Sequence, residues 1–272
     1  MSNPCKVGGP AVISFSGGRT SAMMLRLILD AHDGKLPDDV HVLFANTGKE
    51  MPETLDFVRE CEVRWDVPIT WLEYVDHDEP QQRWREVTYE TASRNGEPFE
   101  ALIARKQYLP NPVTRFCTAE LKIRVMKLYA QQVLGFDDWE VVIGFRADEQ
   151  RRVAKLSLPD KEPFSRSAPL ARMGITKREV GEFWRAQPFD LRLPNMNGTT
   201  MHGNCDLCFL KGGGADFQPD PRSAAARGLV DGSRARSAVA RHQWRRPVPI
   251  RSHELRPDAR LGNRRARRAF SI

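Results

Sequence analysis

The chain has 272 residues, of which 40% are apolar and 28% charged, and its mean hydropathy is -0.51; this composition predicts a soluble globular protein with at least one sizeable core. No run of about 18 apolar residues and no signal-peptide pattern occurs, which argues against a membrane protein and predicts a cytoplasmic location. The net charge of the chain is +7, but residues 212–272 alone hold fourteen Arg, no Lys, four Asp and one Glu. The excess of positive charge therefore belongs to this C-terminal tail. An interaction of the whole surface with nucleic acid is excluded.

Short apolar runs alternate with helical segments through the chain before this tail. Each run is apolar, contains β-branched residues and is followed by small or polar residues, as buried strands are. The predicted strands are 11–15, 40–45, 69–75 and 141–143, and the predicted helices begin at 21 and 52 and cover 121–134. Strands that alternate with helices predict an α/β fold, a Rossmann-like parallel sheet with helices on both faces.

Two further segments carry weaker signals. Thr176 and Glu179 form a capping-box pair, which predicts the start of one more helix. Residues 76–115 are polar and show no clear period, so they hold either a helical insertion or a substrate lid.

A glycine loop, residues 16–21, follows the first predicted strand and has the sequence Ser-Gly-Gly-Arg-Thr-Ser. Between a strand and a helix, its backbone N–H groups can converge on an anion, helped by the helix dipole. A Gly-Gly turn alone is most often plain turn chemistry, but hydroxyl side chains surround this one: Ser14, Ser16, Thr20 and Ser21. The loop lacks the Gly-Lys-Ser/Thr ending of a Walker loop, so the sequence predicts a phosphate site of another kind.

The glycine loop resembles the Ser-Gly-Gly-x-Asp-Ser signature of the PP-loop superfamily, and further motifs resemble the phosphoadenosine phosphosulfate (PAPS) reductase family within it. These motifs are Asn-Thr-Gly at 46–48 with Pro-Glu-Thr at 52–54, Arg-Phe-Cys-Thr-Ala-Glu-Leu-Lys at 115–122, and Gly-Phe-Arg-Ala-Asp-Glu at 144–149. The family usually has Asp-Thr-Gly in the first of these positions. Four motifs in family order, over about residues 11–211, imply that family's fold, which is adenine nucleotide alpha-hydrolase-like.

The resemblance implies that the glycine loop holds the phosphate of an adenine nucleotide, ATP or PAPS, and that three cations hold its distal phosphate or sulfate. The cations are Arg115, Lys122 and Arg146. The full set of implied nucleotide-binding residues is Ser14, Ser16, Gly17, Gly18, Arg19, Thr20, Ser21, Asn46, Thr47, Gly48, Arg115, Lys122, Gly144 and Arg146. Thr20 stands where the superfamily usually has Asp, and the chain has neither a Glu-Cys-Gly ending nor two adjacent cysteines.

Five cysteines, an odd number in a chain without an export signal, argue against a disulfide framework and for thiols or metal ligands. Cys5 and Cys61 have no partner at a ligand spacing, and Cys61, on a predicted helix, is expected to be a core residue.

The other cysteines are the candidate catalytic residues: Cys117, Cys205 and Cys208. Cys205 and Cys208 form a Cys-x-x-Cys in a turn-rich segment, where two thiolates can face one centre. Three arrangements are open, namely a 4Fe-4S cluster on the three cysteines, a zinc site with His202 as the fourth ligand, and a redox dithiol. Unliganded thiols in a loop are the remaining alternative.

The composition predicts a nucleotide-binding domain at 1–211 and an irregular, Arg-rich tail of low order at 212–272. The tail contains many Arg, Ala, Gly and Pro and no Lys. Three interpretations stay open: an arm that binds nucleic acid, an inert extension, or the product of a shifted reading frame in GC-rich coding DNA.

Three functions are considered. The first is a PAPS reductase-like enzyme in which a thiol attacks the sulfur of the bound sulfonucleotide and sulfite leaves after reduction, with a thiol reductant protein as partner. The second is ATP cleavage between the α- and β-phosphates, with sulfur transfer to a nucleic acid. The third is a nucleic-acid-binding module that works through the tail. A homo-oligomer is a further expectation.

Overall fold

A six-stranded sheet forms the centre of the molecule, with the strand order β4-β3-β2-β1-β5-β6. The computed structural model describes residues 3–205 except 112, 158–160, 197–198, 202 and 204. The strands are β1 (Ala11–Phe15), β2 (Val40–Asn46), β3 (Ile69–Glu73), β4 (Arg85–Val87), β5 (Trp139–Ile143) and β6 (Phe164–Ser167). Paired strands run parallel except at β4, which is antiparallel to β3. The Rossmann-like α/β fold predicted from the sequence is therefore confirmed.

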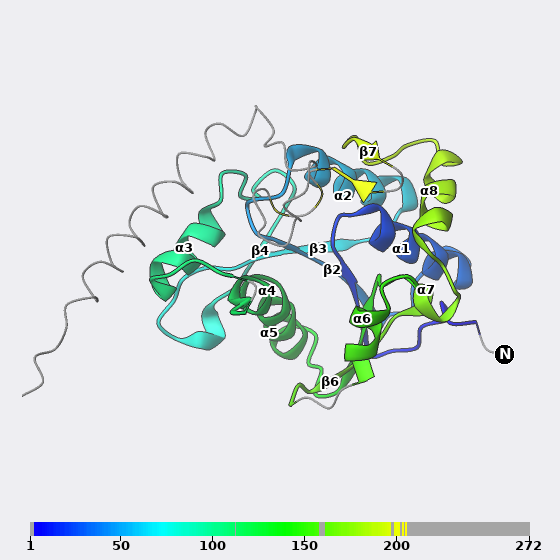
Figure 1. Ribbon diagram of the computed structural model, residues 1–272. Coiled ribbons are helices and arrows are strands. Elements are labelled where there is room, and N and C mark those ends of the chain that lie inside the picture. The colour runs from blue at the N-terminus through cyan, green and yellow to red at the C-terminus, as the bar shows by residue number, and fades with distance from the viewer. Residues whose placement is uncertain are drawn as a thin grey trace, which may run out of the picture.

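Helices cover both faces of the sheet, with α1, α2 and α8 on one face and α4 and α5 on the other (Figure 1). The helical segments are α1 (Arg19–Ala31), α2 (Pro52–Trp65), η1 (Pro80–Gln82), α3 (Glu97–Lys106), α4 (Phe116–Thr118), η2 (Ala119–Arg124), α5 (Val125–Gln132), α6 (Gln150–Val153), η3 (Ala154–Ser157), α7 (Pro169–Arg172) and α8 (Lys177–Arg185). A two-stranded sheet, β7 (Asn195–Met196) and β8 (Thr199–Thr200), follows them. Each face of the sheet has a hydrophobic core: the first core lies under α1, α2 and α8, and the second lies under α4 and α5. Along β1, Ile13 and Phe15 face the first core and Val12 faces the second, because successive side chains of a strand point to opposite faces.

The edge strands β4 and β6 are not predicted by the sequence. β4 consists of Arg-Glu-Val and β6 of Phe-Ser-Arg-Ser, and short polar strands of this kind lack the apolar alternation that marks a half-buried strand. Residues 76–115, predicted as an insertion or a lid, hold η1, β4 and α3, and Leu102 of α3 is buried in the second core. This segment is therefore an edge of the sheet with a packed helix.

The helix predicted at 121–134 begins earlier, because α4, η2 and α5 follow one another without a break from Phe116 to Gln132. Its middle part, η2, is a π-helix, a feature that is rare and frequently occurs at functional sites. The motif at 115–122, which contains Arg115, Cys117 and Lys122, therefore lies at the start of a helix.

Cys61 lies in the core, as predicted, and is fully buried on α2. Cys5 is also buried. Burial raises the pKa of both thiols, that of Cys5 to about 11. Neither thiol is ionised at neutral pH, so neither is suited to act as a nucleophile.

The predicted capping box begins α8. The Thr176 side chain accepts a hydrogen bond from the Arg178 N–H, and the Glu179 carboxylate accepts one from the Thr176 N–H at 2.8 Å. The hydrogen bond from the Thr176 hydroxyl, followed by that from Arg178, lowers the pKa of Glu179 to about 2.

Replacing Glu179 by Gln is expected to change the pH dependence of stability. The pKa of this carboxyl lies at about 2 in the folded protein, below its ordinary value of 4.5, so its contribution is complete above pH 4.5 and is lost as the pH falls toward 2. Urea unfolding of both proteins over this range measures the effect, and their free energies of unfolding should differ at neutral pH and converge in acid. A constant difference at every pH would contradict this role of the carboxylate.

The boundary predicted at residue 211 and the Arg-rich tail lie outside the described residues, as do Cys208 and His202. Within the described ranges, no helix combines the length and the apolar character that crossing a membrane requires.

Candidate anion-binding site

The glycine loop connects the carboxyl end of β1 to the first turn of α1. Its conformation is held by Ser21, whose hydroxyl accepts from the Ser16 N–H at 3.2 Å, lies 3.0 Å from the Ser16 hydroxyl and donates to the Gly18 carbonyl at 2.9 Å. No described side chain caps the first turn of α1 at Gly18. The N–H groups of that turn are therefore suited to bind an anion, together with the positive end of the helix dipole.

Two glycines let backbone segments approach closely at this edge of the sheet. Gly17 has a φ of +72°, and a Cβ there would lie 2.7 Å from Thr54 Cγ2 of α2. A Cβ at Gly144, directly after β5, would lie 3.0 Å from Ser21 Cα. Both predicted glycine positions therefore require the absence of a side chain.

The glycine loop lies where the winding of the sheet changes direction. The chain proceeds from β1 through β2 and β3 to one edge and then returns to β5 on the other side of β1. In open α/β sheets, ligands bind outside the carboxyl ends of the strands at such a switch point. The predicted phosphate site therefore occupies the position in the sheet at which a ligand is expected.

Asn46, predicted to contact the nucleotide, is fully buried and uses its side chain within the protein. Its Nδ2 donates to Glu73 Oε1 at 2.7 Å and to the Ser93 carbonyl at 2.8 Å, and its Oδ1 accepts from the Gly48 N–H at 3.0 Å. Glu73 is also fully buried and is paired with Arg85 of β4 at 2.7 Å. The Asn46 side chain thus shapes the turn after β2.

Arg146 reaches the glycine loop, as the sequence predicts for one of the three cations. Its Nη1 donates to Thr20 Oγ1 at 3.3 Å, and its Nε donates to Asp148 at 2.9 Å. A guanidinium beside the first turn of α1 adds positive charge where that turn already favours an anion. The guanidinium is also ion-paired with Asp148 and, at 3.7 Å, with Glu149, and the neutral Thr20, which replaces the usual Asp, adds no further negative charge at the loop.

The other two predicted cations lie in different settings. Lys122, on η2, has its Nζ 3.5 Å from Glu50 Oε1, and this carboxylate is 2% exposed. Arg115 is exposed, and no hydrogen bond or ion pair joins its guanidinium to another described residue. The structure therefore brings Arg146 to the loop, engages Lys122 with a carboxylate and leaves Arg115 at the surface.

Arg19, predicted as a nucleotide contact, uses its side chain to hold the segment after α8. Its buried guanidinium makes two hydrogen bonds to Asp190, at 2.7 and 2.8 Å. It also donates to the carbonyls of Leu191 and Leu193 and to Thr200 Oγ1. The backbone of Arg19 remains in the first turn of α1, but its charge is directed at residues 190–200.

Among the candidate cysteines, Cys205 is the one that the described contacts place at the carboxyl edge of β2. Its Sγ lies 3.3 Å from Thr47 Oγ1 and 3.6 Å from Glu50 Oε1. Cys117, on α4, is partly buried against the second core. Ser14 is turned toward the same helical stretch, because its Oγ lies 3.8 Å from Met126 Sδ of α5.

The predicted cluster and zinc site both need residues beyond the described ones. In the part of the chain that the structure describes, no three His, Cys, Asp or Glu side chains gather to hold a metal ion. The ligand sets that include Cys208 and His202 stay predictions.

Glu50 and Asp190 were not singled out by the sequence. Glu50 had a local signal, because Thr47 and Glu50 have the Thr-x-x-Glu spacing of a capping box and the Thr47 N–H does donate to the Glu50 carboxylate, at 2.8 Å. Asp190 had none, because its partner Arg19 is 171 residues away in the sequence.

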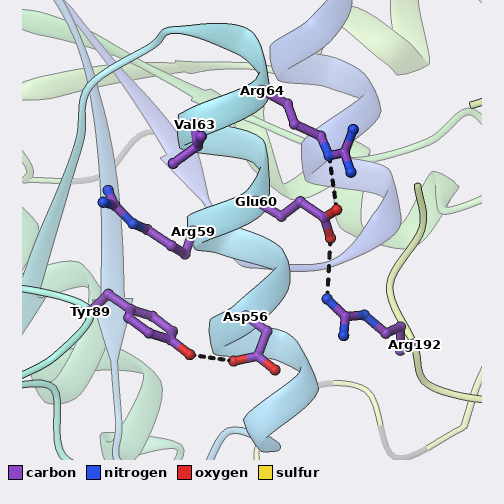
Figure 2. Close-up of a pocket in the computed structure, with 7 residues that line it drawn as sticks. All are labelled: Asp56, Arg59, Glu60, Val63, Arg64, Tyr89 and Arg192. Atoms are coloured by element: carbon purple, nitrogen blue, oxygen red, sulfur yellow. Dashed lines mark hydrogen bonds and ion pairs between the residues drawn. The ribbon is translucent and has the colours of Figure 1, made fainter. Parts of the chain in front are cut away.

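A hollow of about 490 Å³ lies elsewhere, on the outer face of α2 (Figure 2). It is lined by Asp56, Arg59, Glu60, Val63, Arg64, Tyr89 and Arg192. Several of its polar groups pair with one another: Tyr89 donates to Asp56 at 2.6 Å, and Glu60 accepts from Arg64 at 2.8 Å and from Arg192 at 3.4 Å. Because the opposite face of α2 meets the glycine loop at Thr54, this hollow is separate from the candidate site.

The fold and this site define a doubly wound α/β protein with a candidate anion-binding loop at the switch point of its sheet. Residues 10–187 match the model of the phosphoadenosine phosphosulfate reductase domain, and the chain belongs to that family. The match confirms the resemblance recognised in the four sequence motifs. Members of the family act on a nucleotide substrate.

Two individual proteins are similar to this chain. The uncharacterized nin region protein ORF290 of Escherichia phage lambda is 34% identical over 205 residues, which are 74% of this chain and 66% of the phage protein. The match therefore spans slightly less than two thirds of that relative. The crystal structure of a PAPS reductase from Candida auris, in a phosphate complex, is 15% identical with a TM-score of 0.43 and covers 70% of this chain and 83% of that one.

Proposed function

We infer that this chain is an enzyme that binds an adenine sulfonucleotide at the glycine loop and reduces or transfers its sulfur group. The observation that carries this proposal is the meeting of an anion-binding loop and a thiol at one edge of the sheet. No side chain among the described residues caps the first turn of α1, Arg146 contacts the loop through Thr20, and Cys205 lies against the turn after β2. Membership of the PAPS reductase family supports the same substrate class.

The proposed reaction proceeds by two displacements at sulfur. A cysteine thiolate attacks the sulfur of PAPS, a sulfur–sulfur bond forms, the sulfur–oxygen bond to the phosphate breaks, and its electron pair leaves with adenosine bisphosphate. A second thiolate then attacks the modified cysteine, sulfite leaves, and the two cysteines remain joined as a disulfide. A thiol reductant protein restores the two thiols.

The chain's own residues would divide this work. The loop N–H groups and Arg146 would hold the anionic groups of the nucleotide, where the charge of the leaving phosphate develops. Cys205 contacts Thr47 at that edge, and Cys117 and Cys208 are the candidates for the second thiol. This reaction needs no metal, so the predicted 4Fe-4S cluster or zinc site would be an addition to it.

The second candidate is cleavage of ATP between its α- and β-phosphates. It is favoured by the same loop, because an uncapped helix turn with an adjacent guanidinium binds a triphosphate as readily as a sulfonucleotide. Sulfur transfer to a nucleic acid, binding of nucleic acid by the Arg-rich tail and self-association remain further proposals.

Anaerobic incubation of the purified chain with PAPS plus reductant, and separately with ATP, tests the proposal. Chromatography resolves the nucleotides, and a thiol-specific dye detects sulfite. We expect sulfite and adenosine bisphosphate from PAPS. AMP and pyrophosphate from ATP would replace the reductase proposal by the adenylating one, and no product in either tube would refute both.

A further inference from the structure

Glu50 ties Cys205 to the turn after β2. One of its carboxylate oxygens accepts the N–H and the O–H of Thr47, both at 2.8 Å. The other oxygen lies 3.6 Å from Cys205 Sγ and 3.5 Å from Lys122 Nζ. Because Thr47 Oγ1 is itself 3.3 Å from the sulfur, two oxygens of one buried turn converge on Cys205.

The contact between Glu50 and Cys205 spans 155 residues of sequence, so it fixes a distant segment on the site. Asp190, Leu193 and Thr200 of that segment accept hydrogen bonds from the buried guanidinium of Arg19, which belongs to the glycine loop. Arg19 is thus the first anchor of this segment. Cys205, five residues after Thr200, contacts Glu50, which is the second anchor. Both anchors lie at the carboxyl ends of neighbouring strands, one after β1 and the other after β2.

We propose that Glu50 is a positioning residue for Cys205: its carboxylate holds the Cys205 thiol at the edge of the sheet that carries the anion-binding loop. The inference rests on the proposed function, which requires a thiol at that edge. Of the three candidate cysteines, the proposal assigns the thiol at this edge to Cys205. Lys122 supplies the counter-charge that a buried carboxylate needs, so it supports Glu50 in this role.

The proposal predicts that the shape and hydrogen bonding of residue 50 matter more than its charge. Glutamine has the size of Glu50, and its oxygen can accept from the Thr47 donors while its amide N–H donates to the Cys205 sulfur, whereas alanine removes both partners. The full chain is labelled with N-ethylmaleimide under reducing, nucleotide-free conditions, and the rate at each cysteine is read from peptide mass spectra. Glu182→Gln, a change on the exposed side of α8, is the matched control.

In Glu50→Ala we expect the labelling rate of Cys205 to rise by about fivefold or more, the size of effect that a lost hydrogen bond gives. In Glu50→Gln and in the control it should stay within about twofold of the wild type. Cys117 is the internal reference for reagent access, and the buried Cys61 reports on opening of the whole fold.

Three results would overturn the proposal: an unchanged Cys205 rate in Glu50→Ala, equal rates in the alanine and glutamine variants, or a parallel rise at Cys61. The second would show that charge acts instead of position, and the third that Glu50 supports only the general stability of the fold. Failure of the proposed function appears separately, as the absence of sulfite and pyrophosphate from the wild-type chain, whatever the labelling pattern.

Discussion

Gly17→Ala is expected to destabilise the protein by about 2–4 kcal/mol, because two costs add. The first is the left-handed backbone conformation, with a φ of +72°, which costs a residue with a Cβ about 1–2 kcal/mol. The second is steric, because the new methyl would lie 2.7 Å from Thr54 Cγ2 and 3.0 Å from Val58 Cγ2 of α2. Relief of this contact would move α2 away from the glycine loop, so nucleotide binding should weaken as well.

Gly174→Ala separates the two costs. Gly174 has the same φ of +72°, and a Cβ there would have no heavy atom within 4 Å. Its substitution should therefore carry the backbone cost alone, about 1–2 kcal/mol. Guanidinium chloride unfolding of the two variants measures both values. Equal losses of free energy would show that the packing of α2 against the loop is not tight.

Arg19→Met is expected to lower the free energy of unfolding by about 2–3 kcal/mol. The substitution keeps much of the side-chain volume but removes the guanidinium donors to Asp190, Thr200 and two backbone carbonyls. The carbonyl of Leu193, accepting at 3.0 Å, would lose its partner in a buried place. The loss is smaller than for a fully buried ion pair because the Asp190 side chain is 40% exposed and water can solvate it.

The second expected effect of Arg19→Met is local. Release of residues 190–200 should detach the segment that leads to Cys205, so proteolysis should cleave there at concentrations of protease that leave the wild type intact. Arg26→Met is the matched control, since Arg26 pairs with Asp30 one helical turn away on the surface and should cost less than about 0.5 kcal/mol. If both variants unfold at the same denaturant concentration, the Arg19 contacts do not stabilise the fold.

The central strands and the glycine loop were predictable because their signals are local. β1 and β2 are continuous apolar runs, and the small residues after β1 mark the turn to α1. The edge strands β4 and β6 were not predictable in this way, since they are polar and owe their conformation to pairing with β3 and β5. Their position is a property of the sheet and not of their own sequence.

For the site, the sequence predicted which backbone positions meet but not where every side chain points. Gly17, Gly144 and Arg146 lie at the loop as expected. Asn46 and Arg19 were expected to face the nucleotide, but their partners Glu73 and Asp190 lie 27 and 171 residues away in the sequence. A local motif identifies the type of side chain, and only the tertiary fold determines which acceptor it meets.

The contact between Asn46 and Glu73 accounts for one departure from the family pattern. The motif that this segment resembles has Asp where this chain has Asn46, and here the neighbouring Glu73 is fully buried and receives the Asn46 amide and two donors from Ser93. Aspartate at 46 would place a second carboxylate beside the pair that Glu73 forms with Arg85, and it would have no N–H to donate to Glu73 Oε1 or to the Ser93 carbonyl. Residues 46 and 73 therefore form a matched pair, and relatives that keep the usual aspartate are expected to carry an uncharged or donating residue opposite it.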